Sequence, residues 1–227
     1  MKILYLTFLL LISFQFTAQN KFDDLEYKFI NESIEVGYPK SNFEPIFKEC
    51  STTNLCVGVD VSDIMIGRYR LENNTFLNLY FSEGQSDDPQ LFIEYNKEII
   101  LNVIGNKFHF KGETLYVEGI SNNLFDKKRK FNFEHGNFNE VKQPLYFVGI
   151  KGLLKRNIKI YESKSLTSLV ANLPKGNPIE IVMAEFNEDD FAAYFLVKTK
   201  FRLIGWLKIE IDDENGGLID GFYFHGD

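Results

Sequence analysis

Three histidines are the first residues to test for catalytic or metal-binding chemistry. His109 alternates with two phenylalanines, so we expect its side chain on the solvent face of a strand. His135 precedes a glycine in an expected hairpin turn, and His225 stands two residues from the end of the sequence. None of them has the two-ligand spacing of a zinc site, and the acidic residues 212–217 lack the spacing of a calcium loop. The sequence therefore predicts no metal, and without a phosphate-cradling glycine loop it predicts no cofactor.

The two cysteines of the chain, Cys50 and Cys56, are separated by a short polar spacer that can close as a turn. In an exported chain they can form a disulfide. Two alternatives stay open: free cysteines on neighbouring strands, and a catalytic thiol paired with His109. A nucleophilic cysteine normally begins a helix, where the helix dipole lowers the thiol pKa. Cys56 instead enters an expected strand, so the sequence favours a structural pair and predicts no enzyme.

The strongest local run of charge consists of four consecutive cations, Lys127, Lys128, Arg129 and Lys130. They belong to a basic middle, residues 121–164, with ten Lys and Arg against four Asp and Glu, net +6. If residues 126–130 form a hairpin tip, the four side chains project together and attract anionic glycans or lipid head groups. The simpler alternative is a solvated turn that protects a strand edge.

Residues 1–18 have the pattern of a signal peptide, with Lys2 at the start, an apolar run and Ala18 at the expected cut. The apolar run is too short to span a bilayer, and a retained anchor is the alternative. No later segment approaches a spanning length, so we expect an exported, periplasmic or extracellular chain without a membrane span. Export and a net charge of −7 argue against nucleic acid as a partner.

The elements that position these residues are expected to be strands. Apolar and aromatic residues alternate in short runs, and polar turns separate them at the spacing of a sandwich or barrel. The sequence thus predicts an all-β fold, with strands at residues 55–61, 64–71, 75–81, 90–95, 98–103, 107–110, 114–118, 129–133, 145–150, 157–161, 179–183, 193–199 and 202–209. A short helix around Leu25 is the helical element expected near the N-terminus.

Residues 157–211 read as a strand, a polar loop with a helical turn at 166–173, a tight turn, a strand, a hairpin and a last strand. With Leu173-Pro-Lys-Gly176 before a strand and Gly205-Trp206 in the last one, this order resembles the bacterial SH3-like domain. The resemblance implies a small β-barrel in which Gly205 allows close approach of backbones and Trp206 fills the space beside it. The first loop lacks the Arg-x-x-Pro-Ser of that family, so the resemblance carries no ligand specificity.

Members of this family commonly attach exported proteins, and some bind cell-wall peptides. We therefore expect residues 19–150 to form an antiparallel sandwich or barrel-like domain and residues 151–227 an SH3-like domain with a C-terminal extension. Ligand contact is expected from the aromatic residues of that domain, Tyr161, Tyr194 and Trp206. The function expected is an exported, non-enzymatic binding or accessory protein that contacts cell-wall peptide or an envelope protein. The alternatives are a structural interaction subunit of the envelope and a Cys-dependent cell-wall hydrolase.

Overall fold

A computed structural model describes residues 24–50, 63–84, 88–119, 124–186, 192–209 and 217–222 of the chain. The described residues form an all-β fold, as predicted, with one short 3-10 helix, η1 (Lys40–Asn42). Within them no helix is long and apolar enough to cross a membrane. The predicted signal peptide, Cys56, His225 and the acidic residues 212–216 lie outside the described part of the chain.

The first eleven strands form two sheets, and the first of them is a six-stranded sheet, ordered β1-β2-β8-β9-β10-β11, whose strands are not all consecutive in sequence. Its strands are β1 (Glu26–Phe29), β2 (Glu35–Tyr38), β8 (Lys107–Lys111), β9 (Thr114–Gly119), β10 (Lys127–Glu134) and β11 (Asn137–Glu140). Every described pair in this sheet is antiparallel except β2 with β8. A parallel pair needs a long crossover, and here the whole second sheet supplies that connection.

The second sheet is a five-stranded antiparallel meander in chain order. Its strands are β3 (Phe43–Glu49), β4 (Ile64–Arg70), β5 (Phe76–Ser82), β6 (Gln90–Tyr95) and β7 (Glu98–Ile104). Alternation aims one set of side chains at the first sheet, so that Leu77, Leu79 and Phe81 are fully buried. They meet Phe108, Val117 and other inward residues of the first sheet, and the two sheets enclose a single hydrophobic core.

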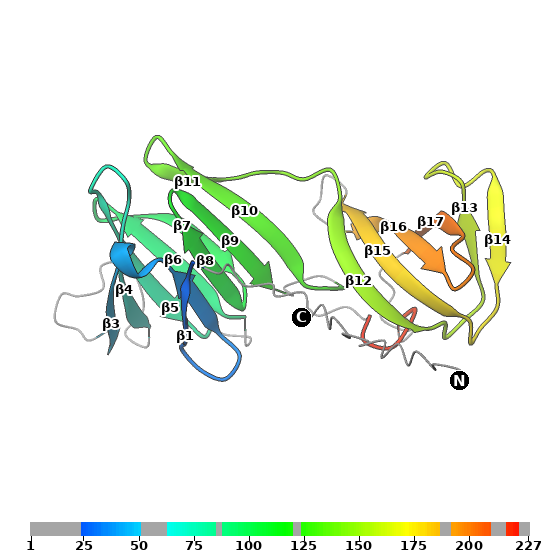
Figure 1. Cartoon of the computed structure of the whole chain (residues 1–227), viewed down its shortest axis with the longest axis horizontal. Coiled ribbons are helices and arrows are strands. Elements are labelled where there is room, and N and C mark those ends of the chain that lie inside the picture. Colours follow the sequence, from blue (N-terminus) through cyan, green and yellow to red (C-terminus); the bar gives the residue numbers. More distant parts are fainter. Residues whose placement is uncertain are drawn as a thin grey trace, which may run out of the picture.

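The third sheet has six strands in the order β12-β15-β16-β17-β13-β14, all antiparallel (Figure 1). Its strands are β12 (Tyr146–Leu153), β13 (Ile158–Tyr161), β14 (Leu169–Leu173), β15 (Pro178–Phe186), β16 (Ala192–Thr199) and β17 (Ile204–Lys208). One face packs on a second core, which includes Ile160, Ile181 and Phe195. Leu218 and Phe222, from the C-terminal part of the chain, complete that core.

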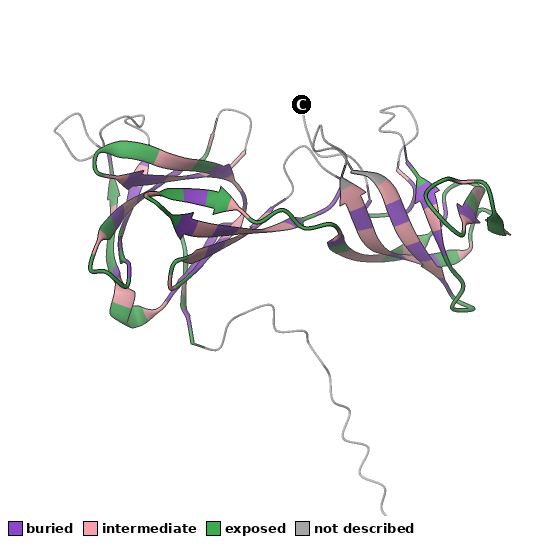
Figure 2. Ribbon diagram, turned by 90° about the horizontal axis from the view of Figure 1, so that it is seen from above, coloured by how far each residue is buried: buried purple, intermediate pink, exposed green. Residues whose placement is uncertain are grey.

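The two cores are separate along the chain, with one exception. Figure 2 shows the buried residues in two groups joined by a largely exposed connection, residues 141–145. Leu124 and Phe125, which precede β10, nevertheless pack into the second core. β12, which the sequence assigned to the first domain up to residue 150, pairs with β15 in the third sheet. The expected boundary between residues 150 and 151 therefore falls inside a strand.

Two helical expectations are wrong. The segment around Leu25 continues into β1, because Glu26 to Phe29 pair with β2 along its free edge. The expected turn at 166–173 is mostly the strand β14, which pairs with β13. In both places a neighbouring strand edge offers backbone hydrogen bonds, and these outweigh a weak local preference for helix.

Candidate functional site

The aromatic residues expected to contact a ligand lie on the outer face of the third sheet, opposite the second core. Tyr161 of β13 is the Cα partner of Trp206 on β17. Tyr194 of β16 lies beside Lys208, two residues further along the same face. Tyr161, Tyr194 and Trp206 are each half-buried. The structure therefore brings Tyr161 and Trp206 together and leaves Tyr194 at the next position.

Trp206 does not fill the interior of the module, and that expectation is wrong. Alternation along β17 sends Leu207 into the core and leaves Trp206 on the outer face. There Lys164 covers it, with its Nζ 5.9 Å from the centroid of the indole ring and 2.6 Å from Glu185 Oε2. Gly205 does permit a close approach, because a Cβ at this position would stand 2.9 Å from Ile160 Cβ.

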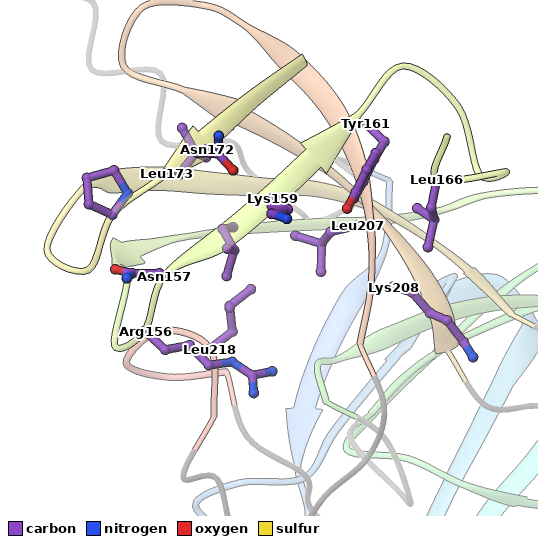
Figure 3. A pocket seen from close by; sticks show the side chains of 12 residues that line it. Arg156, Asn157, Lys159, Tyr161, Leu166, Asn172, Leu173, Leu207, Lys208 and Leu218 are labelled. Atoms are coloured by element: carbon purple, nitrogen blue, oxygen red, sulfur yellow. The ribbon is translucent and has the colours of Figure 1, made fainter. Parts of the chain in front are cut away.

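A pocket of about 650 Å³ opens where β13 and β17 separate. In the described part of these two strands, Tyr161 and Trp206 are the one pair in register. Beyond that pair β13 remains bound to β14 through its other edge, so the separation leaves a slot beside an intact strand. Figure 3 shows Tyr161 at one end of this slot and Arg156 and Asn157 at the other.

The lining of the slot combines cations with an apolar floor. The cationic side chains come from Arg156, Lys159 and Lys208, all of them exposed. Among the described residues that line it there is no acidic side chain. The apolar and aromatic lining residues are Ile158, Tyr161, Leu166, Leu173, Pro174, Leu207 and Leu218. A long opening with these properties suits an extended chain that carries carboxylates between small apolar groups.

Hydrogen bonds of the backbone and of the Asn157 side chain fix the end of the slot that carries Arg156. The Oδ1 atom of Asn157 accepts from the backbone amide of Lys175 at 2.8 Å. Leu154 N donates to Asn177 O at 3.0 Å, and Gly176 N donates to Leu154 O at 2.8 Å. The turn before β15 is therefore tied to the chain that enters β13. A preformed opening lowers the entropy cost of binding.

The basic run of residues 127–130 lies within β10 and does not form a hairpin tip. The turn between β10 and β11 falls later, at His135 and Gly136. Lys127 is only 3% exposed, and its Nζ lies 4.9 Å from the centroid of the Tyr146 ring. Successive side chains of a strand point to opposite faces. The four cations therefore do not form one surface patch, because Lys127 and Arg129 point away from Lys128 and Lys130.

A ladder of alternating charge crosses β8, β9 and β10 on the outer face of the first sheet. Lys107 Nζ lies 2.7 Å from Glu118 Oε1, and Lys128 Nζ lies 3.5 Å from Glu118 Oε2. Burial acts to raise the pKa of Glu118, but the hydrogen bond and charge of Lys107, with the charge of Lys128, outweigh it and hold that pKa below its ordinary value. Glu118 therefore forms ion pairs with both Lys107 and Lys128.

His109 lies on the face opposite Phe108 and Phe110, as alternation predicts, but it is buried and not solvent-facing. Its Nε2 lies 3.0 Å from Glu35 Oε1, and both side chains are less than a tenth exposed. The ring of Tyr27 packs edge-on against the imidazole, with centroids 5.3 Å apart. Desolvation lowers the pKa of His109, although the hydrogen bond to Glu35 acts in the opposite direction. The two side chains are thus joined by a buried hydrogen bond between His109 Nε2 and Glu35 Oε1.

A second pocket, of about 390 Å³, adjoins this network. Its described lining residues are His109, Tyr116, Val117, Glu118, Lys128, Arg129, Lys130, Val141 and Gln143. Gln143 closes one side by donating from Nε2 to Lys128 O at 2.9 Å, and Arg129 donates to Ile104 O. Most polar groups here are thus engaged within the protein. The pocket has less free charge than the slot between β13 and β17.

Cys50 is buried and disulfide-bonded, and it packs with Met65, Tyr80 and Phe92 on the outer side of the second sheet. The other cysteine, Cys56, lies outside the described residues. A sulfur held in a disulfide is not a thiolate nucleophile while the bond persists. His109 is likewise engaged with Glu35, so the structure does not bring together a thiol and a histidine at this place. In the described ranges no group of three or more His, Cys, Asp and Glu side chains could hold a metal ion.

The sequence named part of this site. Tyr161 was identified, and Arg156 and Lys159 lie in the basic middle, residues 121–164. Leu207 and Lys208 were not identified, because their position depends on where β13 and β17 part. The alternation of polar and apolar residues in Gly205–Lys208 was the signal that could have shown which of them face outward.

Comparison of the chain with models of protein families, with curated proteins and with solved structures finds no match in any of the three.

Proposed function

We propose that this protein is an exported, non-enzymatic binding protein whose C-terminal SH3-like module holds an extended anionic peptide of the cell wall in the slot between β13 and β17. Another envelope component with the same chemistry is the alternative ligand. The proposal combines the signal peptide expected from the sequence with the resemblance of residues 157–211 to the bacterial SH3-like domain.

One observation carries the proposal: the slot places three exposed cations around an apolar floor, beside Tyr161. Arg156 and Lys159 have no ion pair with any described residue. Their charge is available to a ligand, whereas the apolar floor suits small side chains between the carboxylates of a peptide. The aromatic ring of Tyr161 adds a surface against which an extended backbone can pack.

The two alternative functions fit the described residues less well. A Cys-dependent hydrolase needs a free thiol, and Cys50 is disulfide-bonded. A purely structural interaction subunit would be expected to use a flat apolar face, and its charged residues would be secondary. The slot instead concentrates positive charge in a concave opening.

Co-sedimentation of residues 19–227 with purified peptidoglycan sacculi tests the proposal. The intact chain is needed because a cut at residue 150 would divide β12. We expect pelleting that largely resists moderate salt and that falls about tenfold or more in the double variant Arg156→Glu with Lys159→Glu. Both side chains are exposed, so the fold should persist, which circular dichroism can verify.

The matched control is Lys48→Glu, a charge reversal at an exposed position of β3. It should pellet like the parent chain. Equal losses in the control and in the slot variant would indicate charge attraction without a site. Absence of pelleting in every variant would refute the cell-wall proposal and leave a protein of the envelope as the partner to seek.

A further inference from the structure

One end of the third sheet presents apolar side chains to solvent among cations. We define this tip surface by three apolar residues, Leu153, Phe201 and Leu203, and three cations, Lys151, Lys200 and Arg202. The apolar side chains are 56%, 87% and 46% exposed, in that order. Lys151, Leu153, Lys200 and Arg202 line a single shallow hollow of about 610 Å³, so β12 and the β16–β17 hairpin contribute to one surface.

The hairpin that carries Phe201 is held in a fixed shape. Thr199 N donates to Leu203 O at 2.8 Å, and Arg202 N donates to Thr199 O at 2.9 Å. The Thr199 hydroxyl also accepts from Leu203 N at 3.1 Å. Arg202 adopts a positive φ of 66°, which closes the turn. These bonds hold the backbone of the turn in place, and the side chain of Phe201 at its apex is 87% exposed.

Within the part of the chain that the structure describes, no acidic side chain pairs with the cations of the tip surface. Lys151, Lys200 and Arg202 form no ion pair with a described residue, and all three are exposed. The acidic side chain in the same hollow, Glu180, lies 3.4 Å from Lys198 and is thus compensated. The tip surface carries a net positive charge around its exposed phenylalanine.

We propose that the tip surface docks on an anionic lipid surface. A phenylalanine at an apex can enter the interface of a bilayer without a complementary cavity, because lipids rearrange around it. Flanking lysine and arginine side chains then remain at the depth of the head groups, where each gains from the negative surface potential. This protruding shape fits a deformable surface better than a rigid protein, which would need a matching depression for Phe201.

The docking is independent of peptide binding in the slot. Lys159 and Arg156 line the slot, and Lys200 and Arg202 line the hollow at the tip. Lipid contact would hold the third sheet against a membrane while the slot stays open to its ligand. Failure of one binding activity would leave the other unaffected.

Co-sedimentation of residues 19–227 with vesicles tests this proposal. We expect binding to vesicles with one third phosphatidylglycerol in phosphatidylcholine, weak binding to phosphatidylcholine alone, and loss at high salt. Phe201→Ser should weaken the partition coefficient about tenfold. The double variant Lys200→Gln with Arg202→Asn should weaken it by about twentyfold, and asparagine tolerates the positive φ at position 202.

The matched controls are Phe29→Ser and Lys48→Gln, which remove an exposed phenylalanine and an exposed lysine from the N-terminal half. Both should bind vesicles like the parent, and Arg156→Glu with Lys159→Glu should also retain most of the binding. Absence of vesicle binding, or binding that the tip variants leave unchanged, would overturn the proposal. So would concentration-dependent self-association of the parent that Phe201→Ser abolishes without any vesicle binding, which would assign the tip to a protein contact.

Discussion

The outer faces of the first and third sheets carry charged residues in different ways. On the first sheet, Glu118 bridges two lysines, and His109 is bonded to the buried Glu35. On the third sheet, exposed cations such as Lys159 and Lys200 have no acidic partner among the described residues, and apolar side chains lie beside them. Among the described residues, the lysines that flank Glu118 on the first face are paired with it, whereas Lys159 and Lys200 of the third sheet have no such partner.

This difference shows that consecutive basic residues in a sequence do not by themselves form a basic surface. A run of cations in sequence, as at residues 127–130, is divided between two faces by strand alternation, and two of its members, Lys127 and Lys128, contact Tyr146 and Glu118. Cations that are distant in sequence, such as Arg156 and Lys208, can instead meet around one opening. We therefore assign a structural role to the network of the first sheet and a binding role to the third sheet.

The largest expected effect is the loss of the buried pair in the first sheet. Glu35→Ala removes the carboxylate that lies 3.0 Å from the buried Nε2 of His109, which should destabilise the N-terminal half by about 3 kcal/mol. Urea unfolding followed by circular dichroism should show the shift. Trp206 is the single tryptophan, so its fluorescence reports on the third sheet and should shift much less.

The control for this change is Glu26→Ala, which removes a half-exposed carboxylate paired with Lys40 at 3.1 Å. Its effect should stay within about 0.5 kcal/mol. If Glu35→Ala were equally mild, the network would not be structural and the comparison of the two faces would fail.

A smaller effect is expected from crowding β13 against β17. In Gly205→Ala the new Cβ would stand 2.9 Å from Ile160 Cβ and 3.0 Å from Tyr161 O. Relief of this contact should lower the free energy of unfolding by about 2 kcal/mol. The unfolding transition followed by Trp206 fluorescence should then occur at a lower urea concentration. It should also distort the slot, so binding to sacculi should weaken in the same variant. Unchanged stability would mean that the two strands are further apart than described.

Acidification should destabilise the first sheet. The pKa of His109 is lowered on folding, so the unfolded chain binds the proton more tightly and stability falls as the pH drops below the ordinary imidazole value of 6.5. The pKa of Glu118 is also lowered, which adds a second loss of stability below its ordinary value of 4.5. Thermal unfolding at a series of pH values should show both steps. His109→Gln should remove the first step and keep the second.

The smallest effect on stability is expected at the tip of the third sheet. Phe201 is 87% exposed, so Phe201→Ser should change the free energy of unfolding by no more than about 0.5 kcal/mol. Trp206 fluorescence in urea measures this directly. A larger loss would show that Phe201 packs against the protein, and the tip would then belong with the structural residues.

The strands themselves followed from the alternation of residue types. Predicted segments such as 90–95 and 114–118 coincide with β6 and β9, because one face of each sheet must be apolar. The partner of a strand does not follow from this pattern. β12 has the same composition whether it pairs in the first sheet or the third, and the pairing with β15 depends on distant residues.

From the sequence, the part of the site that could be predicted is the set of side chains that a strand places on its outer face. Tyr161 was identified as an aromatic residue of an expected strand, where alternation places some aromatic side chains on the outer face. The burial of His109 was missed, since Glu35 and Tyr27 reach it from strands more than 70 residues earlier in the chain. The slot was missed because the separation of β13 from β17 leaves no signal in either segment.

A map of ligand contacts by nuclear magnetic resonance tests most directly whether the third sheet binds the ligand. Soluble peptide-bearing fragments of digested sacculi would be titrated into isotope-labelled residues 19–227. We predict amide shift changes concentrated at residues 156–161 and 205–208, and none along β8, β9 and β10. Changes centred on His109 and Lys128, or no changes at saturating fragment, would contradict the assignment of binding to the third sheet.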